Sequence, residues 1–370
     1  MILERRQFLA GSAATAMLLG RPSFAQDLSP SPAERAKMAE AATAFAARYQ
    51  VPGIAIAVAR GKDVLYDEAF GLADAFTGEW LASSHRFRIA SISKPITSTA
   101  VFTLIEQGRL RLDDRAFGPG SILGDRFGTI AASSPLAAVT LRHLLTHTAG
   151  GWPNDSTDPM FARTGLDHAA LIAWTLANRS LGNPPGTAFA YSNFGYCLIG
   201  RMIEAVTGQA YADYVQAAVL KPAGALDMRI AGNGLTARQP REVRYHKGAK
   251  DDPYALNVAR MDSHGGWIAS ASSIARFAAG LEAVLKPASI AEELAPSSDR
   301  GRYAKGWRVN PGGNAWHTGH LAGTTARMFR ARNGLAWAAL LNTRHRGDDL
   351  DGDLDRTLWT MMRTVPAWKA

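Results

Sequence analysis

The 370-residue chain contains a single cysteine, Cys197. An internal disulfide is therefore excluded, and with it the class of small secreted proteins whose folds depend on disulfides. Cys197 lies in the apolar run GYCLIG, where a buried thiol that packs as a small hydrophobic group is the ordinary interpretation. No segment repeats with a period of roughly 20 to 50 residues, and no low-complexity block occurs, so solenoid and fibrous architectures are excluded as well.

Lysine is also scarce, because only nine of the 41 basic residues are Lys. The formal net charge of +9 indicates a basic surface. No basic run alternates with aromatic residues, as segments that bind nucleic acid do, so the sequence predicts no nucleic-acid partner. An anionic polymer of the cell envelope would suit this charge, but net charge alone does not identify a partner.

No apolar run reaches the ~20 residues that a membrane-spanning helix needs. The N-terminal segment has a charged start, 14 uncharged residues over Gln7–Gly20, and the tripeptide SFA ending at Ala25. This is the pattern of a signal peptide, and the RRQFL run at residues 5–9 resembles a twin-arginine export signal. We therefore predict a signal peptide over residues 1–25 and a mature protein in the periplasm or otherwise outside the cytoplasm, without stable membrane insertion. A retained amphipathic anchor is the alternative.

Strand and helix patterns gather at the two ends of the chain. Ser31 and Pro32 predict the start of an Ala-rich helix over Ala33–Tyr49. The run GIAIAVAR then predicts a buried strand with Ile and Val on one face and Ala on the other, and the Ala face allows an Ala-rich helix to pack closely. Gly61-Lys62 joins this strand to DVLYDEAFG as a hairpin.

The C-terminal end mirrors this arrangement. TTARMFRAR and LAWAALLNT flank Asn333-Gly334, a strong hairpin signal, and a helix over Leu354–Arg363 follows. Between the two ends the patterns are mainly helical, as in Ala169–Ala177 and Gly195–Thr207. We therefore predict an α+β fold (an α/β sandwich), in which one antiparallel sheet is flanked by N- and C-terminal helices and carries an inserted all-helical subdomain. The predicted bounds are one domain over 26–370, with an α/β part at about 31–96 and 301–370 and a helical part at about 97–300.

Ser91 and Lys94 are the first candidates for chemistry. On a helix, residues three apart share a face, and Pro95 indicates that both lie in the first turn. A serine there has a free backbone N–H that can hold a developing oxyanion, and a buried lysine of lowered pKa can accept its hydroxyl proton. Of the nine lysines, only Lys94 follows a Ser by three residues. A solvated helix start with a surface lysine is the alternative.

Tyr191 and Asn193 form the second candidate pair. They lie in PPGTAFAYSNFGYCLIG, in a turn before a helix, and Tyr191 is the only tyrosine with Asn two residues on. A phenol beside a cation can relay a proton between a nucleophile and a leaving group. The Asn193 amide can donate to a substrate and accept from Lys94. A buried tyrosine with a hydrogen-bonded hydroxyl is the alternative.

The third element is the run His317-Thr318-Gly319-His320. Gly319 suits an edge strand whose backbone must approach a bound acyl group closely. His317 and Thr318 offer a hydrogen-bond donor or cation and a hydroxyl, which together could bind a carboxylate.

These three motifs, S-x-x-K, Y-x-N and [KH]-T-G in this order, resemble the serine beta-lactamase and penicillin-binding-protein superfamily. Within it, the chain is similar to the branch of class C beta-lactamases, DD-peptidases and related esterases, which use Y-x-N. The similarity extends over roughly residues 33 to 362 and includes LRHLLTHTAG, GGWIASASSIARFAAGL and GHLAGTTARMFRARNGLAWAALLNT. It implies the beta-lactamase/transpeptidase-like fold and a serine hydrolase that forms a covalent acyl-enzyme, without cofactor or metal.

The resemblance assigns roles to the motif residues. Ser91 matches the nucleophile, Lys94 its proton partner and Tyr191 the general base and acid. The resemblance also implies an oxyanion hole of two backbone N–H groups, those of Ser91 and His320. Residues that match substrate-binding positions are Asn193, His317, Thr318 and Gly319.

Two positions depart from the pattern of class C beta-lactamases. Lys is usual at the position of His317, and a hydroxyl residue is common at that of His320. Histidine with an ordinary pKa of ~6.5 is mostly neutral at pH 7, so its interaction with a substrate carboxylate is weaker. This favours a DD-carboxypeptidase or muropeptide hydrolase, or a small-ester hydrolase, over a beta-lactamase. A non-catalytic penicillin-binding or sensor protein is the alternative from another class.

The pair His143 and His147 has the i, i+4 spacing of a zinc protease motif. Leu144 stands where that motif carries its catalytic Glu, so no zinc site is predicted. The expected partner is a small-molecule or peptidyl acyl substrate, and the sequence leaves the oligomeric state open.

Overall fold

The computed structural model describes residues 28–246, 252–344 and 349–369. The predicted signal peptide over 1–25, with its twin-arginine run, lies outside these residues. Within the described part of the chain, no helix is both long enough and apolar enough to cross a membrane.

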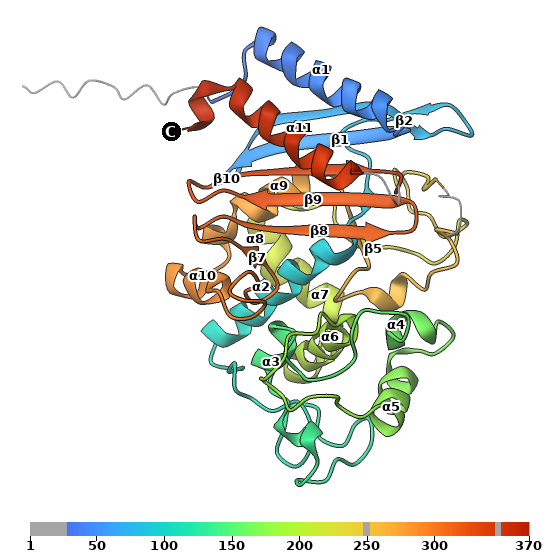
Figure 1. Ribbon diagram of the computed structural model, residues 1–370, viewed down its shortest axis with the longest axis vertical. Coiled ribbons are helices and arrows are strands. Elements are labelled where there is room, and N and C mark those ends of the chain that lie inside the picture. The colour runs from blue at the N-terminus through green and yellow to red at the C-terminus, as the bar shows by residue number, and fades with distance from the viewer. Residues whose placement is uncertain (1–27, 247–251, 345–348, 370) are drawn as a thin grey trace, which may run out of the picture.

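A seven-stranded antiparallel sheet joins the two ends of the chain, as predicted (Figure 1). Its order is β3-β2-β1-β10-β9-β8-β7. The strands are β1 (Gly53–Arg60), β2 (Asp63–Asp74), β3 (Glu79–Trp80), β7 (Arg308–Val309), β8 (Ala315–Leu321), β9 (Thr324–Arg330) and β10 (Leu335–Leu341). The N- and C-terminal hairpins meet where β1 pairs with β10, in a register that runs from Ile54 opposite Leu341 to Arg60 opposite Leu335.

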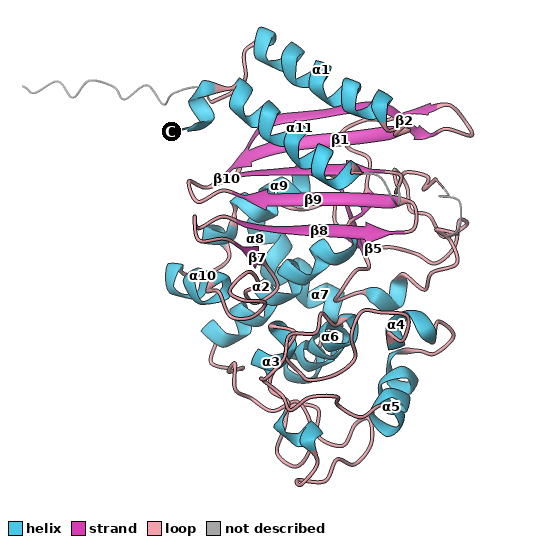
Figure 2. Cartoon of the chain, viewed as in Figure 1, coloured by secondary structure: helices cyan, strands magenta, loops and turns pink. Residues whose placement is uncertain are grey.

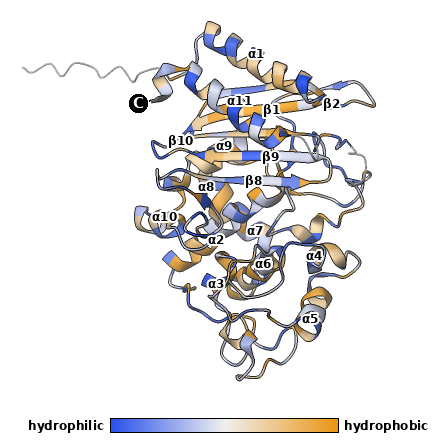
Figure 3. Ribbon diagram, in the orientation of Figure 1, coloured by the Kyte–Doolittle hydropathy of each residue, from blue (hydrophilic) through white to orange (hydrophobic). Residues whose placement is uncertain are grey.

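The two faces of β1 pack against different layers, as its sequence pattern predicts. Ile54, Ile56 and Val58 belong to the core beneath α1 (Pro32–Arg48) and α11 (Leu350–Thr364). The alanines of the other face belong to the main core and pack against the short Ala-rich helix α9 (Ala271–Ala279). Because alanine is small, α9 approaches the sheet closely. In Figure 3, β1 is mostly coloured as hydrophobic, whereas β8 is paler and bluer.

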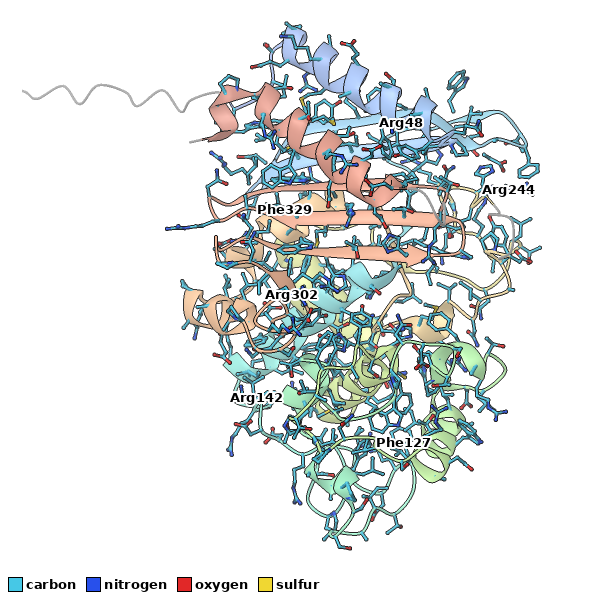
Figure 4. All side chains as sticks on the ribbon, viewed as in Figure 1. Arg48, Phe127, Arg142, Arg244, Arg302 and Phe329 are labelled. Atoms are coloured by element: carbon cyan, nitrogen blue, oxygen red, sulfur yellow. The ribbon has the colours of Figure 1, made fainter. Side chains whose placement is uncertain are left out.

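Both flanking helices are close to their predicted bounds. Ser31 caps α1 in a capping box with Glu34, and Pro32 occupies its first position. Helix α11 begins at Leu350, four residues before the predicted start at Leu354, and Leu350 is buried in the core that it shares with α1. Phe329 on β9, labelled in Figure 4, makes an edge-on ring contact with Trp359 of α11.

Helices and loops make up most of the rest of the chain (Figure 2). The helices are α2 (Ser93–Glu106), α3 (Leu141–Leu145), α4 (Pro159–Ala162), α5 (His168–Asn178), α6 (Asn193–Thr207), α7 (Tyr211–Val215), α8 (Lys221–Ala223) and α10 (Pro287–Leu294). The inserted part is not all-helical as predicted, because a second, three-stranded sheet in the order β4-β6-β5 is built from β4 (Phe87–Arg88), β5 (Arg229–Ile230) and β6 (Trp267–Ala269). These strands are too short to show an alternating pattern in the sequence. Strand β8 lies next to the helical layer, so the third sequence motif faces the first two across this boundary (Figure 1).

Candidate active site

Ser91 lies in a single 3-10 turn, η1 (Ala90–Ile92), between β4 and the start of α2. This differs slightly from the prediction, because Lys94 is in α2 whereas Ser91 precedes it. Ala90 has a φ of 48°, a left-handed conformation that costs a non-glycine residue ~1 kcal/mol or more. The Ser93 hydroxyl donates to the Ala90 carbonyl at 2.7 Å and supports this turn. The Ser91 side chain therefore lies at the N-terminal end of α2, where it remains partly exposed.

Gly319 of β8 is packed against this turn. A Cβ atom at Gly319 would lie 2.0 Å from the carbonyl oxygen of Ile89, so any larger residue would push β8 away from the Ser91 turn. The prediction required a small residue for the approach of a substrate, whereas the group that approaches Gly319 here is the backbone that precedes Ser91. Gly319 thus sets the distance between the first and third motifs.

Lys94 is fully buried and its ammonium group has three hydrogen-bond acceptors. Nζ donates to Ser91 Oγ at 3.1 Å, to Asn193 Oδ1 at 2.8 Å and to the His264 carbonyl at 3.0 Å. Nζ also lies 4.7 Å from the centre of the Tyr191 ring. The four predicted residues of the first two motifs therefore converge on a single point, with Lys94 at its centre.

Burial sets the protonation of Lys94 and Tyr191. Desolvation lowers the pKa of Lys94 to about 7, and the charge of Asp158 opposes this change. Desolvation raises the pKa of Tyr191 above its ordinary value, although the Ser91 hydroxyl and the charge of Arg308 act the other way. Near pH 7, Lys94 is thus a group that accepts and releases a proton, while Tyr191 remains a phenol.

Asn193 is held in one orientation at the start of α6. Its Nδ2 donates to Asp158 Oδ2 at 2.8 Å and to Asn154 Oδ1 at 2.9 Å, so its Oδ1 faces Lys94. The backbone N–H of Asn154 also donates to the Tyr191 carbonyl at 2.7 Å. Asn154 and Asp158 belong to the loop PNDSTDP, which carries no motif signal, and sequence reasoning did not identify them.

His317 is buried, with 2% of its surface exposed, and it does not titrate as the sequence led us to expect. Desolvation lowers its pKa to about 3, and the charge of Lys94 acts in the same direction. Its Nδ1 donates to the Thr318 carbonyl at 2.7 Å, which leaves Nε2 to accept from the Tyr303 hydroxyl at 3.4 Å. The assumption of an ordinary pKa near 6.5 was therefore wrong, because a sequence motif does not report burial.

Tyr303 links His317 to a second buried histidine. His147 Nδ1 accepts from the Ser192 backbone N–H at 3.1 Å, so its Nε2 is the donor to the Tyr303 hydroxyl at 3.0 Å. Burial also lowers the pKa of His147 well below its ordinary value. The chain of hydrogen bonds from Ser192 through His147 and Tyr303 to His317 contains neutral groups throughout. Tyr303 had no sequence signal.

An open cleft of about 1000 Å³ gives access to Ser91. Tyr191, His317, Thr318 and His320 line it together with Ser91, so the cleft brings all three motifs together. The His320 imidazole is turned toward α11, where Nε2 lies 2.9 Å from Asp351 Oδ1. Its side chain is therefore engaged by the sheet layer, and the role expected of His320 concerns its backbone N–H alone.

Arg308 on β7 also lines this cleft and was not identified from the sequence. Its side chain is 37% exposed and lies 3.7 Å from Asp299. The charge of Arg308 lowers the pKa values of both Tyr191 and His317, so its field reaches the groups around Ser91.

The two histidines of HLLTH point to different places. His143 belongs to the capping of α3 by Thr140, whereas His147 lies beyond that helix with a φ of 58° and packs against Tyr191, 4.2 Å between ring centres. No group of three His, Cys, Asp or Glu side chains is arranged to hold a metal ion in the described ranges 28–246, 252–344 and 349–369. Cys197 is buried on α6 as a free thiol.

Solved structures share the fold. The D-amino acid amidase from Ochrobactrum anthropi SV3, in its complex with L-phenylalanine amide, superposes with a TM-score of 0.72 over 90% of this chain and 99% of that one, at 22% identity. The octameric penicillin-binding protein homologue from Pyrococcus abyssi superposes with a TM-score of 0.70 over 90% of this chain and 79% of that one, at 21% identity. Identities this low establish the fold alone, and they confirm its predicted class.

Two curated relatives are more similar in sequence. Penicillin-binding protein 4* of Bacillus subtilis (strain 168) is 32% identical over 196 residues, which are 51% of this chain and 40% of that protein. Esterase EstB of Burkholderia gladioli is 32% identical over 213 residues, which are 54% of this chain and 52% of that protein. The chain therefore spans about half or less of the length of these relatives. The family model described as Beta-lactamase matches residues 38–358, and the chain belongs to this beta-lactamase family.

Proposed function

We propose that this protein is a serine hydrolase that forms a covalent acyl-enzyme at Ser91 on an ester or amide carbonyl. The observation that carries the proposal is the contact between Lys94 and Ser91, 3.1 Å from Nζ to Oγ, made by a buried lysine whose pKa is lowered to about 7. A surface lysine would be protonated at this pH and could not accept a proton. Membership of a family with a penicillin-binding protein and an esterase among its relatives supports the same reaction class.

The protons follow from the contacts. Lys94 Nζ takes the Ser91 hydroxyl proton while Oγ forms a bond to the carbonyl carbon, and the carbonyl oxygen becomes an oxyanion. The backbone N–H groups of Ser91 and His320 are the proposed donors to that oxyanion. When the tetrahedral intermediate collapses, the bond to the leaving group breaks, and the leaving group takes a proton from the Tyr191 phenol. Lys94 then gives its own proton to the Tyr191 oxygen. Water then attacks the Ser91 ester and gives a proton to Lys94. The bond to Ser91 Oγ breaks, the acid leaves, and Lys94 returns the proton to Oγ.

The charges around the cleft bear on the choice of substrate. Neutral, buried His317 offers no positive charge to a carboxylate, whereas Arg308 lies on the cleft wall with its guanidinium partly exposed. A peptidyl substrate with a carboxylate directed at Arg308 is therefore favoured, as for a DD-carboxypeptidase or muropeptide hydrolase. Thr318 remains the proposed substrate-binding residue beside it. Asn193 and Gly319, which the sequence also assigned to the substrate, instead hold Lys94 and the Ser91 turn in place.

A small-ester hydrolase is the second candidate, because the neutral interior formed by His317, Tyr303 and His147 needs no charged substrate. Beta-lactamase activity is the less favoured alternative, since the third motif lacks a lysine. A non-catalytic penicillin-binding or sensor protein is the alternative from another class. Hydrolysis of D-alanyl dipeptides, p-nitrophenyl esters and nitrocefin by one preparation distinguishes the three activities.

Export belongs to the same proposal. The N-terminal segment with its RRQFL run supports a twin-arginine signal peptide over 1–25, and thus a periplasmic or otherwise extracytoplasmic protein that acts on a small-molecule or peptidyl substrate.

Covalent labelling tests the reaction class. A fluorophosphonate is expected to add one equivalent to the unmodified protein, as measured by intact mass, and peptide mapping is expected to place it on Ser91. The variant Ser91→Ala is expected to take no label and to lose roughly 10⁴-fold or more in turnover. Ser84→Ala, at an exposed position seven residues before Ser91, is the matched control and keeps the label. An unlabelled native protein would indicate the non-catalytic alternative, and a label on another serine would refute the assignment of Ser91.

A further inference from the structure

Asp158 is a buried carboxylate that the proposed mechanism does not use. It is separated from Lys94 by one side chain, that of Asn193. Its side chain has no exposed surface, and it lies at the N-terminus of α4. Oδ1 accepts from the Met160 backbone N–H at 2.9 Å, and Oδ2 accepts from Asn193 Nδ2 at 2.8 Å. A helix cap needs only one of these contacts, and an exposed aspartate makes it as well. The complete burial of this carboxylate therefore calls for a second explanation.

The contact with Asn193 settles which way that amide points. An asparagine side chain has one donor end and one acceptor end, and both are used here. Because Asp158 Oδ2 and Asn154 Oδ1 can only accept, Nδ2 must face them and Oδ1 must face Lys94. If Asp158 lost its charge by becoming an amide, the Asn193 side chain could turn over and present N–H groups to the Lys94 ammonium.

Asp158 also acts on Lys94 through its charge. It raises the pKa of Lys94 against the effect of desolvation, and Lys94 in turn lowers the pKa of Asp158, which burial raises to about 6. The other charged or titratable groups that act on Asp158 or feel its charge are Asp155 in the same loop, Tyr191, and Arg260, whose guanidinium binds the carbonyls around α4. Asp158 is joined to Lys94 through a single side chain, that of Asn193.

We infer that Asp158 is a positioning residue for Lys94: it fixes the Asn193 amide with its oxygen toward Nζ and supplies the buried negative charge that faces the ammonium. In this arrangement the chain of contacts runs from Asp158 through Asn193 and Lys94 to Ser91. Asp158 itself touches no reacting atom. Its effect is on the pH at which Lys94 becomes able to accept the Ser91 proton, and the inference rests on the proposed function.

The test is the pH profile of fluorophosphonate labelling for Asp158→Asn and Asp158→Ser, from about pH 5 to about pH 9. Without the carboxylate, desolvation of Lys94 is less opposed and its pKa falls further. The acidic limb of the labelling rate is therefore expected to move by about one pH unit toward lower pH in both variants, because Lys94 then loses its proton sooner. The plateau rate is expected to fall about tenfold, because Asn193 is no longer held in one orientation.

Asp158→Asn keeps the shape of the side chain, and Asp158→Ser keeps an oxygen that can cap α4. Asp213→Asn is the matched control, since Asp213 is exposed on α7, and its labelling rate and profile are expected to be unchanged. In the unmodified protein, the carboxyl ¹³C resonance of Asp158 is expected to titrate above the ordinary pKa of aspartate, and an ordinary titration would contradict its burial beside Lys94.

A purely structural role predicts something different: a lower midpoint of thermal unfolding and a lower rate at every pH, with the acidic limb unmoved. That result would overturn the inference, and so would an unchanged profile. Failure of the inference remains distinct from failure of the proposed function. An unlabelled native protein refutes the function, whereas labelling at Ser91 with an unmoved pH profile refutes only the role of Asp158.

Discussion

Replacement of His317 by glutamine isolates the consequence of burying a neutral imidazole beside Lys94. A glutamine side chain can accept from the Tyr303 hydroxyl and donate to the Thr318 carbonyl, so it can retain both hydrogen bonds of His317. What it removes is the group that titrates. The pKa of His317 is about 3 in the folded protein and ~6.5 in the unfolded chain, so below about pH 6.5 the unfolded chain takes up a proton that the folded protein excludes.

The difference between these two pKa values sets the direction and the size of the change in stability with pH. The stability that depends on neutral His317 is fully present above about pH 6.5 and is lost as pH falls toward 3. Each pH unit costs about 1.4 kcal/mol, so the unmodified protein is expected to lose roughly 3 kcal/mol between about pH 7.5 and pH 4.5 relative to His317→Gln. The comparison of the two proteins cancels the other groups that titrate in this range, among them Asp158 and Glu293, whose pKa values burial raises.

Urea unfolding of both proteins at several pH values measures the effect. The difference in unfolding free energy between the two proteins is expected to change by roughly 3 kcal/mol between about pH 7.5 and pH 4.5. In hydrolysis assays, the preference for carboxylate-bearing over neutral esters is expected to show no step near pH 6.5. Two parallel stability curves would refute the low pKa of His317. A substrate preference with a midpoint near pH 6.5 that His317→Gln abolishes would refute it as well, and would restore the interpretation that His317 binds carboxylates as a cation.

Three further outcomes are expected. The double variant Lys94→Ala, Tyr191→Phe should lose little more turnover than the worse single variant, because residues that act as one unit are strongly non-additive, and multiplicative losses would show two independent roles. His317→Lys should lower activity and should also lower stability, by roughly 3 kcal/mol or more in urea unfolding, because it adds a buried ammonium near that of Lys94. Improved hydrolysis of acidic substrates by this variant would contradict the expectation. Changing Arg5 and Arg6 to Lys should leave the precursor inside the cell in fractionation and immunoblotting, and normal export would favour the general secretory route.

The parts of this protein that sequence predicts well are local ones. The hairpin at Asn333-Gly334 and the contact between Ser91 and Lys94 depend on residues within a few positions of each other, and the structure has both. The resemblance of the three ordered motifs to a known family then predicts that distant segments lie together in one site. Asp158 and Tyr303 could not be found in this way, because each reaches the site only through tertiary contacts with residues that are far from it in the chain.

Burial was the other quantity that the sequence did not supply. His317 carries the same letters H-T-G whether its imidazole faces water or a tyrosine, yet its charge at pH 7 depends on that difference. The helix start at Leu350 was missed for a related reason, since Leu350 is buried against the core beneath α1 although polar and acidic residues follow it closely.

The distribution of charge around Ser91 suggests how one cleft can combine proton transfer with recognition of an anionic substrate. Inside, the site contains one lysine of lowered pKa, a buried carboxylate three contacts away from Ser91, and a wall of neutral phenols and imidazoles. A second cation in this interior would lower the pKa of Lys94 further and expose Tyr191 to a stronger field. Arg308 avoids that cost because its guanidinium lies on the rim, where water screens it. In the proposed function, a substrate places its carboxylate at the rim and its carbonyl in the neutral interior, so Arg308 is expected to govern affinity and Lys94 the chemical step.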